Sequence, residues 1–303
     1  MTELLPHVAA FLAVATPARP WPTLTPSEAR AQLRAGQRPD VGAPDVPTSD
    51  QSIRGRGGNM IPLRIYGGKV DSPVLVFLHG GGWVYGDLDM ADGFCRRLCD
   101  SADVTVVSVD YRLSPEAKYP LALDDASDAI DWANATFANG RRIGVVGSSA
   151  GGNLAIAACI RIRDAGAGPG GIGLHVPMCA VTDHRFDTSS YAAFADGLFL
   201  TAEDMRWYWG HYLGDPQHGD EPTASVLRAD LHDMPPALVI TAELDPLRDE
   251  AESYAARLVE AGGTAVVQRF DGMIHAFPVL TAFPVEQAAV IAAIGDAVDS
   301  VLR

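Results

Sequence analysis

Apolar runs of the strand type alternate with helical patterns along most of the chain. The apolar runs begin with IPLRIY at residues 61–66 and recur at residues 74–79, 104–110, 143–147, 173–181, 237–242 and 264–270. Helical patterns lie between most of them, at residues 94–102, 121–133, 153–166 and 249–261. Near-continuous apolar strands that alternate with helices are typical of a mostly parallel sheet covered by helices on both faces. The pattern therefore predicts an α/β fold with such a central sheet.

Two segments depart from this alternation. Residues 1–50 are rich in proline and alanine, with helix-like pieces at 3–14 and 26–35. We expect them to form the N-terminal part of a helical cap on the main domain, which spans residues 51–303. The second segment, residues 183–225, is rich in aromatic side chains and lies between two strand-like runs. It predicts a helical cap insertion over a site, and the alternative is a packing excursion without such a role.

Composition and charge narrow the possible partners. The 303 residues are 48% hydrophobic, which is enough to bury a large core, and α/β folds of this length often form one domain. The formal net charge of -15 repels phosphate backbones and anionic lipids, so we expect neither nucleic acid nor a membrane as a partner. Apolar runs also stay shorter than the roughly 18 residues that a membrane-spanning helix needs.

Cysteine use and the N-terminal sequence predict a cytoplasmic protein. The four cysteines are too few and too unpatterned for a secreted disulfide scaffold, and they are Cys95, Cys99, Cys159 and Cys179. The apolar stretch VAAFLAVA at residues 8–15 is an alternative signal peptide, but a basic segment does not precede it. A first amphipathic helix is the preferred interpretation.

A strained serine turn is the main candidate for chemistry. The sequence GSSAG at residues 147–151 fits the G-x-S-x-G nucleophile elbow, which lies between a strand and a helix. Centred on Ser149, the motif has glycine on both flanks, whereas centring on Ser148 would crowd the turn with the β-branched Val146. Ser149 is therefore the predicted nucleophile. By itself, the motif also fits a glycine-rich turn that merely precedes a helix.

A serine hydroxyl needs a histidine to accept its proton and a carboxylate to orient that histidine. In this type of fold the chain order is serine, acid, histidine. His275 follows the last strand-like run, and Asp245 follows the run before it. Asp249 and Glu250 compete with Asp245 for the acid, but both also fit as first-turn acids of a helix. We therefore expect Asp245 and His275, with Glu250 a distant second.

The sequence HGGG at residues 79–82 predicts an oxyanion hole, in which backbone amides stabilise negative charge on the attacked carbonyl. Gly81, Gly82 and Ala150 are the expected donors, and His79 is expected to brace the loop. Neither a metal nor a cofactor is expected. Cys95 and Cys99 lack a nearby ligand pair, and the glycine-rich residues 165–173 lack the setting of a dinucleotide site.

Five motifs together resemble the bacterial hormone-sensitive-lipase-like esterases, which have the α/β-hydrolase fold. They are HGGGW at 79–83, DYRLSPE at 110–116, GSSAGG at 147–152, DPLRDE at 245–250 and GMIHAF at 272–277. The resemblance implies the same triad and oxyanion donors, and it also implies that Asp110, Arg112 and Glu116 form a structural brace. Two departures affect rate and selectivity: Ser148 stands where the family usually has aspartate or threonine, and Ala276 where it usually has glycine.

The sequence therefore predicts a serine carboxylesterase that hydrolyses short-chain acyl or aryl esters through an acyl-enzyme, as a monomer or homodimer. The alternatives are an amide hydrolase or acyltransferase with the same triad, or a non-catalytic small-ligand receptor of the same fold. Such receptors look like hydrolases that lost the histidine, and His275 is present. Side chains expected to line a compact substrate pocket are Trp83, Tyr85, Phe199, Leu200, Trp207 and Trp209.

Overall fold

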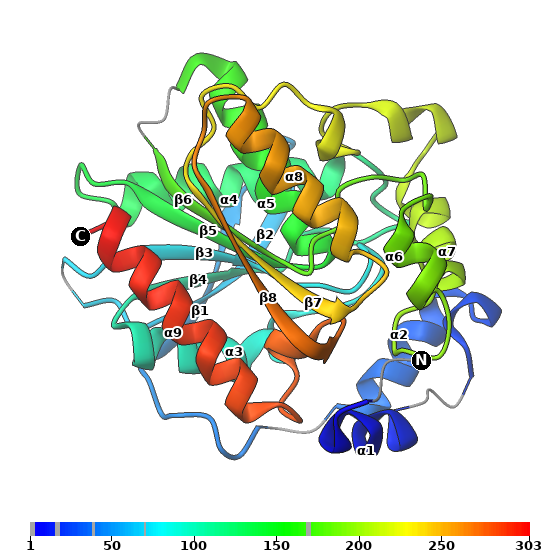
Figure 1. Cartoon of the computed structure of the whole chain (residues 1–303). Coiled ribbons are helices and arrows are strands. Elements are labelled where there is room, and N and C mark those ends of the chain that lie inside the picture. Colours follow the sequence, from blue (N-terminus) through cyan, green and yellow to red (C-terminus); the bar gives the residue numbers. More distant parts are fainter. Residues whose placement is uncertain (1–3, 16–18, 38–39, 70, 168–170) are drawn as a thin grey trace.

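The computed structural model describes residues 4–15, 19–37, 40–69, 71–167 and 171–303. Parts of the expected cap segment and of the glycine-rich stretch after residue 165 lie outside these ranges. The described strands form one eight-stranded sheet in the order β1-β2-β4-β3-β5-β6-β7-β8 (Figure 1). Their bounds are β1 Thr48–Arg54, β2 Met60–Tyr66, β3 Val74–Leu78, β4 Thr105–Val109, β5 Ile143–Ser148, β6 Ile172–Met178, β7 Ala237–Leu244 and β8 Ala265–Ile274.

The sheet is parallel from β4 to β8, and β1 and β2 join it antiparallel at one edge. Every residue of β3, β4, β5 and β6 is buried, as their continuous apolar sequences predict. Helices cover both faces of the sheet (Figure 1). On one face lie α4 (Leu121–Phe137), α5 (Ala150–Ile162) and α8 (Arg248–Glu260), and on the other lie α3 (Leu88–Ala102) and α9 (Pro284–Val301).

The remaining helices gather beside the carboxyl ends of the central strands (Figure 1). From the N-terminal segment come α1 (Pro6–Val14), η1 (Trp21–Thr23) and α2 (Pro26–Gly36). The insertion between β6 and β7 contributes α6 (Ser189–Phe194), α7 (Ala202–Tyr212) and η4 (Pro216–Asp220). Short turns at Arg163–Ala167, Val226–Arg228 and Phe277–Val279 complete the helical elements of the described residues. The two groups touch each other, because the rings of Phe11 and Phe199 lie 5.5 Å apart.

Three elements differ from the sequence expectation. Strand β1 is not predicted, because it lies at the edge of the sheet and only Ile53 within it is buried. It begins at Thr48, so residues 48–50 belong to the sheet and not to the N-terminal segment. Helix α9 is also absent from the predicted elements. Helix α3 starts at Leu88, earlier than expected, because the Asp87 side chain caps it by accepting from the Met90 amide at 2.8 Å.

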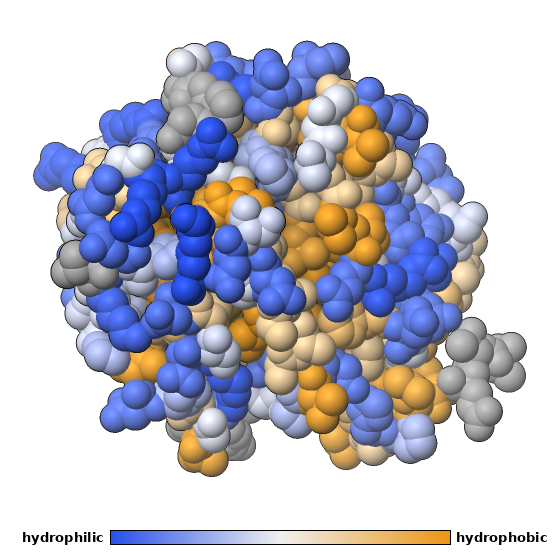
Figure 2. Space-filling view, turned by 60° about the vertical axis from the view of Figure 1, so that its left-hand side comes forward, coloured by the Kyte–Doolittle hydropathy of each residue, from blue (hydrophilic) through white to orange (hydrophobic). Residues whose placement is uncertain are grey.

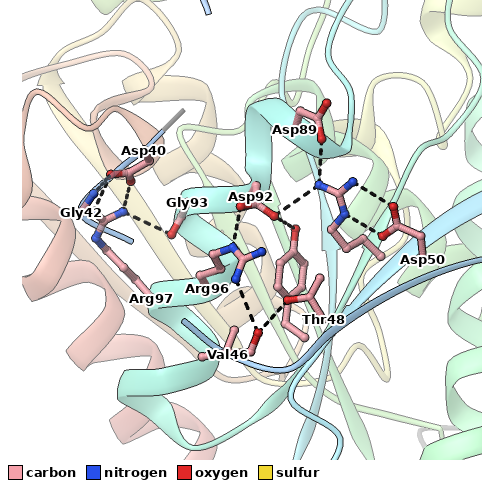
Figure 3. A network of polar contacts seen from close by, with 12 residues as sticks. Asp40, Gly42, Val46, Thr48, Asp50, Asp89, Asp92, Gly93, Arg96 and Arg97 are labelled. Atoms are coloured by element: carbon pink, nitrogen blue, oxygen red, sulfur yellow. Dashed lines mark hydrogen bonds and ion pairs between the residues drawn. The ribbon is translucent and has the colours of Figure 1, made fainter. Parts of the chain in front are cut away.

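Ion pairs fasten the segment before β1 to helix α3 (Figure 3). The Arg97 guanidinium on α3 binds the Asp40 carboxylate with two hydrogen bonds. Nearby, Arg64 of β2 donates to Asp50 of β1 at 2.7 Å and to Asp89 of α3 at 2.8 Å. These contacts hold the edge of the sheet and the chain that leads into it against one helix.

Hydrophilic residues are spread widely over the face that Figure 2 shows, with hydrophobic areas between them. Within the described residues, the helices are too short or too polar to cross a lipid bilayer.

Candidate active site

Strand β5 and helix α5 meet at Ser149, which has φ 55° and ψ -117°. A positive φ is unfavourable for a residue with a Cβ, so the surrounding packing must enforce this turn. The two flanking glycines are required by space. A Cβ on Gly147 would lie 2.1 Å from the Gly151 carbonyl oxygen, and one on Gly151 would lie 2.0 Å from the Leu78 carbonyl oxygen. The elbow therefore presents Ser149 at the carboxyl end of a central strand.

Ser149, His275 and Asp245 form a continuous hydrogen-bonded chain. The His275 Nε2 atom lies 3.0 Å from the Ser149 Oγ, and its Nδ1 lies 2.8 Å from the Asp245 Oδ2. The other carboxylate oxygen of Asp245 accepts from the Leu247 amide at 2.9 Å. All three side chains are almost fully buried, and Ser149 is the most exposed at 8%. Nδ1 donating to Asp245 leaves Nε2 free to accept the serine proton.

Ser148 and Glu250, the competing residues, take other positions. Ser148 is buried, and within the described residues its Oγ has no hydrogen-bond partner. The Glu250 carboxylate is buried and accepts from the amides of Thr182 at 2.7 Å and Asp183 at 3.3 Å. Burial raises the pKa of Glu250 well above its usual value. Glu250 thus braces the chain that follows β6, in addition to lying in the first turn of α8 as the sequence suggests.

The glycine loop after β3 lies beside the elbow, since a Cβ on Gly80 would be 3.4 Å from the Ser149 Cβ. Gly81 and Gly82 have φ of 117° and 58°, which favour glycine. The Gly81 carbonyl accepts from the Val84 and Tyr85 amides at 3.0 and 3.1 Å, which closes the loop. Within the described residues, the amides of Gly81, Gly82 and Ala150 donate to neither backbone nor side-chain acceptors. They are free to bind a ligand oxygen.

His79 contacts the glycine loop and the residue Tyr111. Its Nδ1 lies 2.7 Å from the Gly80 carbonyl oxygen, and its ring stacks on Tyr111 at 4.2 Å. The Tyr111 hydroxyl donates to the His79 carbonyl at 2.7 Å. Burial lowers the pKa of His79 to about 4, so this histidine is neutral at pH 7. These contacts agree with the predicted bracing role.

The DYRLSPE segment makes bracing contacts through two of its charged residues. Arg112 donates twice to the Asp125 carboxylate, each time at 2.8 Å. Glu116 pairs with Arg30 of α2, whose guanidinium also donates to the Val84 carbonyl of the glycine loop at 2.8 Å. Burial raises the pKa of Asp110, the third charged residue, to about 6.

The aromatic residues expected to line a pocket fall into two groups. Trp83 has no exposed surface, and its ring stacks on Tyr212 at 4.1 Å and contacts Trp209 at 4.8 Å. Trp83 therefore packs between the glycine loop and helix α7. Its ring packs within the core because α7 supplies aromatic partners for it, and a substrate contact stays a prediction that this burial does not favour.

The other predicted pocket residues are Tyr85, Phe199, Leu200, Trp207 and Trp209, and Trp209 is buried against Trp83. Leu200 is buried and Phe199 is 39% exposed, against Phe11 of α1. Trp207 packs edge-on to His211 at 4.5 Å. Sequence reasoning missed Tyr208, whose ring covers the glycine loop beside Tyr85. The run MRWYWGHY carries the signal, because residues one helical turn apart share a face.

The four cysteines are free and buried. The Sγ atom of one of them, Cys179, lies within 4.8 Å of an Asp245 carboxylate oxygen and of a His275 ring nitrogen. Within the described ranges, this buried group is the one set of three side chains close enough to hold a metal ion. Two of its members, Asp245 and His275, are already hydrogen-bonded to each other in the chain that leads to Ser149.

Comparisons with known proteins agree with this geometry. The model of the alpha/beta hydrolase fold family matches residues 75–279. The carboxylic ester hydrolase LipN of Mycobacterium tuberculosis is 41% identical over 244 residues, which cover 77% of this chain but 64% of that protein. The ethyl acetate hydrolase of Pseudomonas putida is 34% identical and is covered to 92%. A hyperthermophilic esterase from Pyrobaculum calidifontis superposes with a TM-score of 0.89 at 34% identity, covering 99% of both chains.

These matches confirm the predicted α/β-hydrolase fold and the resemblance to hormone-sensitive-lipase-like esterases. They extend over the segments that supply the elbow, the glycine loop and the histidine loop. The chain belongs to the alpha/beta hydrolase fold family.

Proposed function

We propose that this protein is a serine carboxylesterase for short or compact esters. The observation that carries the proposal is the hydrogen-bonded chain from Ser149 through His275 to Asp245, at a strained strand-to-helix turn. The relatives named as carboxylic ester hydrolase and ethyl acetate hydrolase support the same reaction. Hydrolysis of esters needs no more than these groups and water.

The reaction proceeds in two matched halves. The Ser149 Oγ attacks the ester carbonyl carbon while His275 Nε2 takes the serine proton. The carbonyl oxygen then carries a negative charge, which the amides of Gly81, Gly82 and Ala150 stabilise. His275 passes the proton to the leaving alcohol, and an acyl group remains on Ser149. A water molecule repeats the sequence and releases the acid.

Asp245 orients His275 and stabilises its charged form. The carboxylate is 1% exposed and is fixed by the Leu247 amide, so it cannot turn away from the imidazole. Glu250, in the first turn of α8, instead accepts from the backbone after β6. The geometry therefore supports Asp245 as the acid of the triad.

The acyl and alcohol groups are held beneath the N-terminal helices and the insertion, which together we propose to be the cap. We expect the large side chains predicted for the pocket to restrict the volume that a long chain would need; they are Trp83, Tyr85, Phe199, Leu200, Trp207 and Trp209. Each methylene that fits adds about 0.8 kcal/mol of burial. Catalytic efficiency should therefore rise from acetyl to about butanoyl or hexanoyl and then fall.

A panel of p-nitrophenyl esters from acetate to dodecanoate, run beside aryl amides, tests this proposal. Ser149→Ala should lower kcat by about 10⁴-fold or more, and Ser148→Ala is the matched control that should keep most turnover. An optimum at dodecanoate with activation at an oil-water interface would contradict the compact site. Faster turnover of amides than of esters, or acyl transfer to added alcohols in preference to water, would favour the alternative activities.

We also propose that the protein acts in the cytoplasm on small molecules, as a monomer or homodimer, without nucleic acid or membrane partners. The four free cysteines support a reducing location. Gel filtration with light scattering measures the oligomeric state directly.

A further inference from the structure

Two tyrosines join the insertion to the glycine loop. Tyr85 lies on the loop itself, and Tyr208 lies on helix α7 of the insertion. Their hydroxyl oxygens are 2.6 Å apart, so one hydroxyl donates to the other. The rings meet edge-on, with centroids 5.8 Å apart and an angle of 71° between their planes. Tyr208 is buried and Tyr85 is half-buried, so this bond is largely shielded from water.

Each tyrosine also fixes one of the glycines whose amides are free. The Tyr85 amide donates to the Gly81 carbonyl at 3.1 Å, which sets the position of Tyr85 relative to Gly81. On the other side, the Tyr208 ring rests directly on Gly82, because a Cβ added there would lie 2.2 Å from the ring. A shift of α7 away from the loop would therefore remove the contact that confines Gly82.

The tyrosine pair stays protonated at neutral pH. Burial raises the pKa of Tyr85 to about 12 and holds that of Tyr208 well above its usual value. Trp21 of the N-terminal segment also packs against the Tyr85 ring, with ring centroids 5.3 Å apart, and so restricts the movement of Tyr85. The hydroxyl bond is thus a fixed connection between the insertion and the loop.

We propose that Tyr85 and Tyr208 are positioning residues that hold the Gly81 and Gly82 amides in the geometry that stabilises the oxyanion. The insertion then sets the rate of the chemical step as well as covering the substrate. This inference rests on the proposed esterase function. It adds a tyrosine pair, spread over two distant segments, to the groups on which turnover depends.

Replacing either tyrosine by phenylalanine tests the inference, because the ring stays and only the hydroxyl bond is lost. Tyr208→Phe and Tyr85→Phe should each lower kcat for p-nitrophenyl butanoate by about 3- to 10-fold, with KM within twofold. The double variant should lose no more than either single one, since both changes break the same bond. Tyr212→Phe is the matched control: it lies on the same helix, and within the described residues its hydroxyl has no partner.

An alkyl trifluoromethyl ketone supplies a readout that a merely structural role would not move. Ser149 adds to its carbonyl carbon, the serine proton goes to His275, and the resulting oxyanion occupies the position of the proposed amides. The inhibition constant should rise by the same factor by which kcat falls, while melting temperatures match that of Tyr212→Phe. If one single variant fails to fold, the other tests the same bond.

Unchanged kcat and inhibition constant in the folded tyrosine variants, or losses that multiply in the double variant, would overturn the inference. If the wild type hydrolyses esters, Ser149→Ala does not, and the tyrosine variants are unaffected, the esterase proposal stands and this inference is wrong. A wild-type protein without ester hydrolysis removes both.

Discussion

Adding a single methyl group to the glycine loop, by Gly82→Ala, should disable the proposed oxyanion hole. Gly82 has φ 58°, where a residue with a Cβ costs about 1–2 kcal/mol. The new Cβ would also lie 2.2 Å from the Tyr208 ring, so the ring or the loop must retreat by roughly 1 Å or more to reach ordinary contact. Buried aromatic neighbours resist this movement of Tyr208, and we expect the loop to shift.

Loss of one oxyanion donor lowers kcat by about 10²- to 10³-fold. We therefore expect kcat for p-nitrophenyl butanoate to fall by that factor in Gly82→Ala, with a smaller change in KM. Circular dichroism and thermal melts establish that the variant is folded. Gly58→Ala is the matched control, since Gly58 has φ 83° with open space around its Cβ position. It imposes the backbone strain without the clash, and its kcat should stay unchanged.

A kcat within twofold of wild type in folded Gly82→Ala would refute the reasoning. That result would mean that the loop accepts a side chain at this position without moving its amides, or that the amides do not bind the oxyanion. An equal fall in Gly58→Ala would also refute it, because the loss would then come from general strain.

Three further predictions concern packing and charge. Trp83→Ala should lower the free energy of unfolding by about 3–5 kcal/mol in urea titrations, because it empties a fully buried aromatic stack; a loss below 1 kcal/mol would contradict this packing. Asp110→Asn should melt higher than wild type at pH 7.5 but not near pH 4. The folded-state pKa of Asp110 is raised to about 6, so the wild type loses stability as pH rises from about 4 to 6. After allowance for partial exposure the gain is about 1 kcal/mol, and an equal gain at both pH values would exclude this cause. Asp245→Asn should lower kcat by about 10⁴-fold while Glu250→Gln changes it several-fold at most, and equal losses would leave the acid unassigned.

Much of the fold follows from local sequence, because strands buried on both faces must be apolar along their whole length. Strand β5 illustrates this, as its run IGVVG is buried throughout and leads directly into the serine turn. This rule does not apply to the edge strand β1, which is not buried on both faces. Its sequence TSDQSIR is mostly exposed, and its place depends on pairing with β2, which the pattern within β1 does not encode.

The residues proposed for chemistry are predictable for a different reason. Ser149 can be identified because only glycine fits on both of its flanks, at Gly147 and Gly151. This requirement appears directly in the sequence as the G-x-S-x-G motif. Tyr208 carries no such restriction. Its importance arises where α7 folds back over Gly82, a contact between positions 126 residues apart in the chain that depends on how the insertion packs. The burial of Trp83 depends on the same packing, since Tyr212 and Trp209 of the insertion cover its ring.

Mass spectrometry of the protein after treatment with a p-nitrophenyl alkylphosphonate tests the central claim most directly. The reagent phosphonylates an activated serine and releases one equivalent of p-nitrophenol. We expect a single adduct, on the peptide that contains residues 147–151, with fragment ions that assign it to Ser149. Ser148→Ala should label as fully as wild type, and Ser149→Ala should not label. An adduct on Ser148 or on a serine outside this peptide, in wild-type protein that hydrolyses esters, would contradict the account.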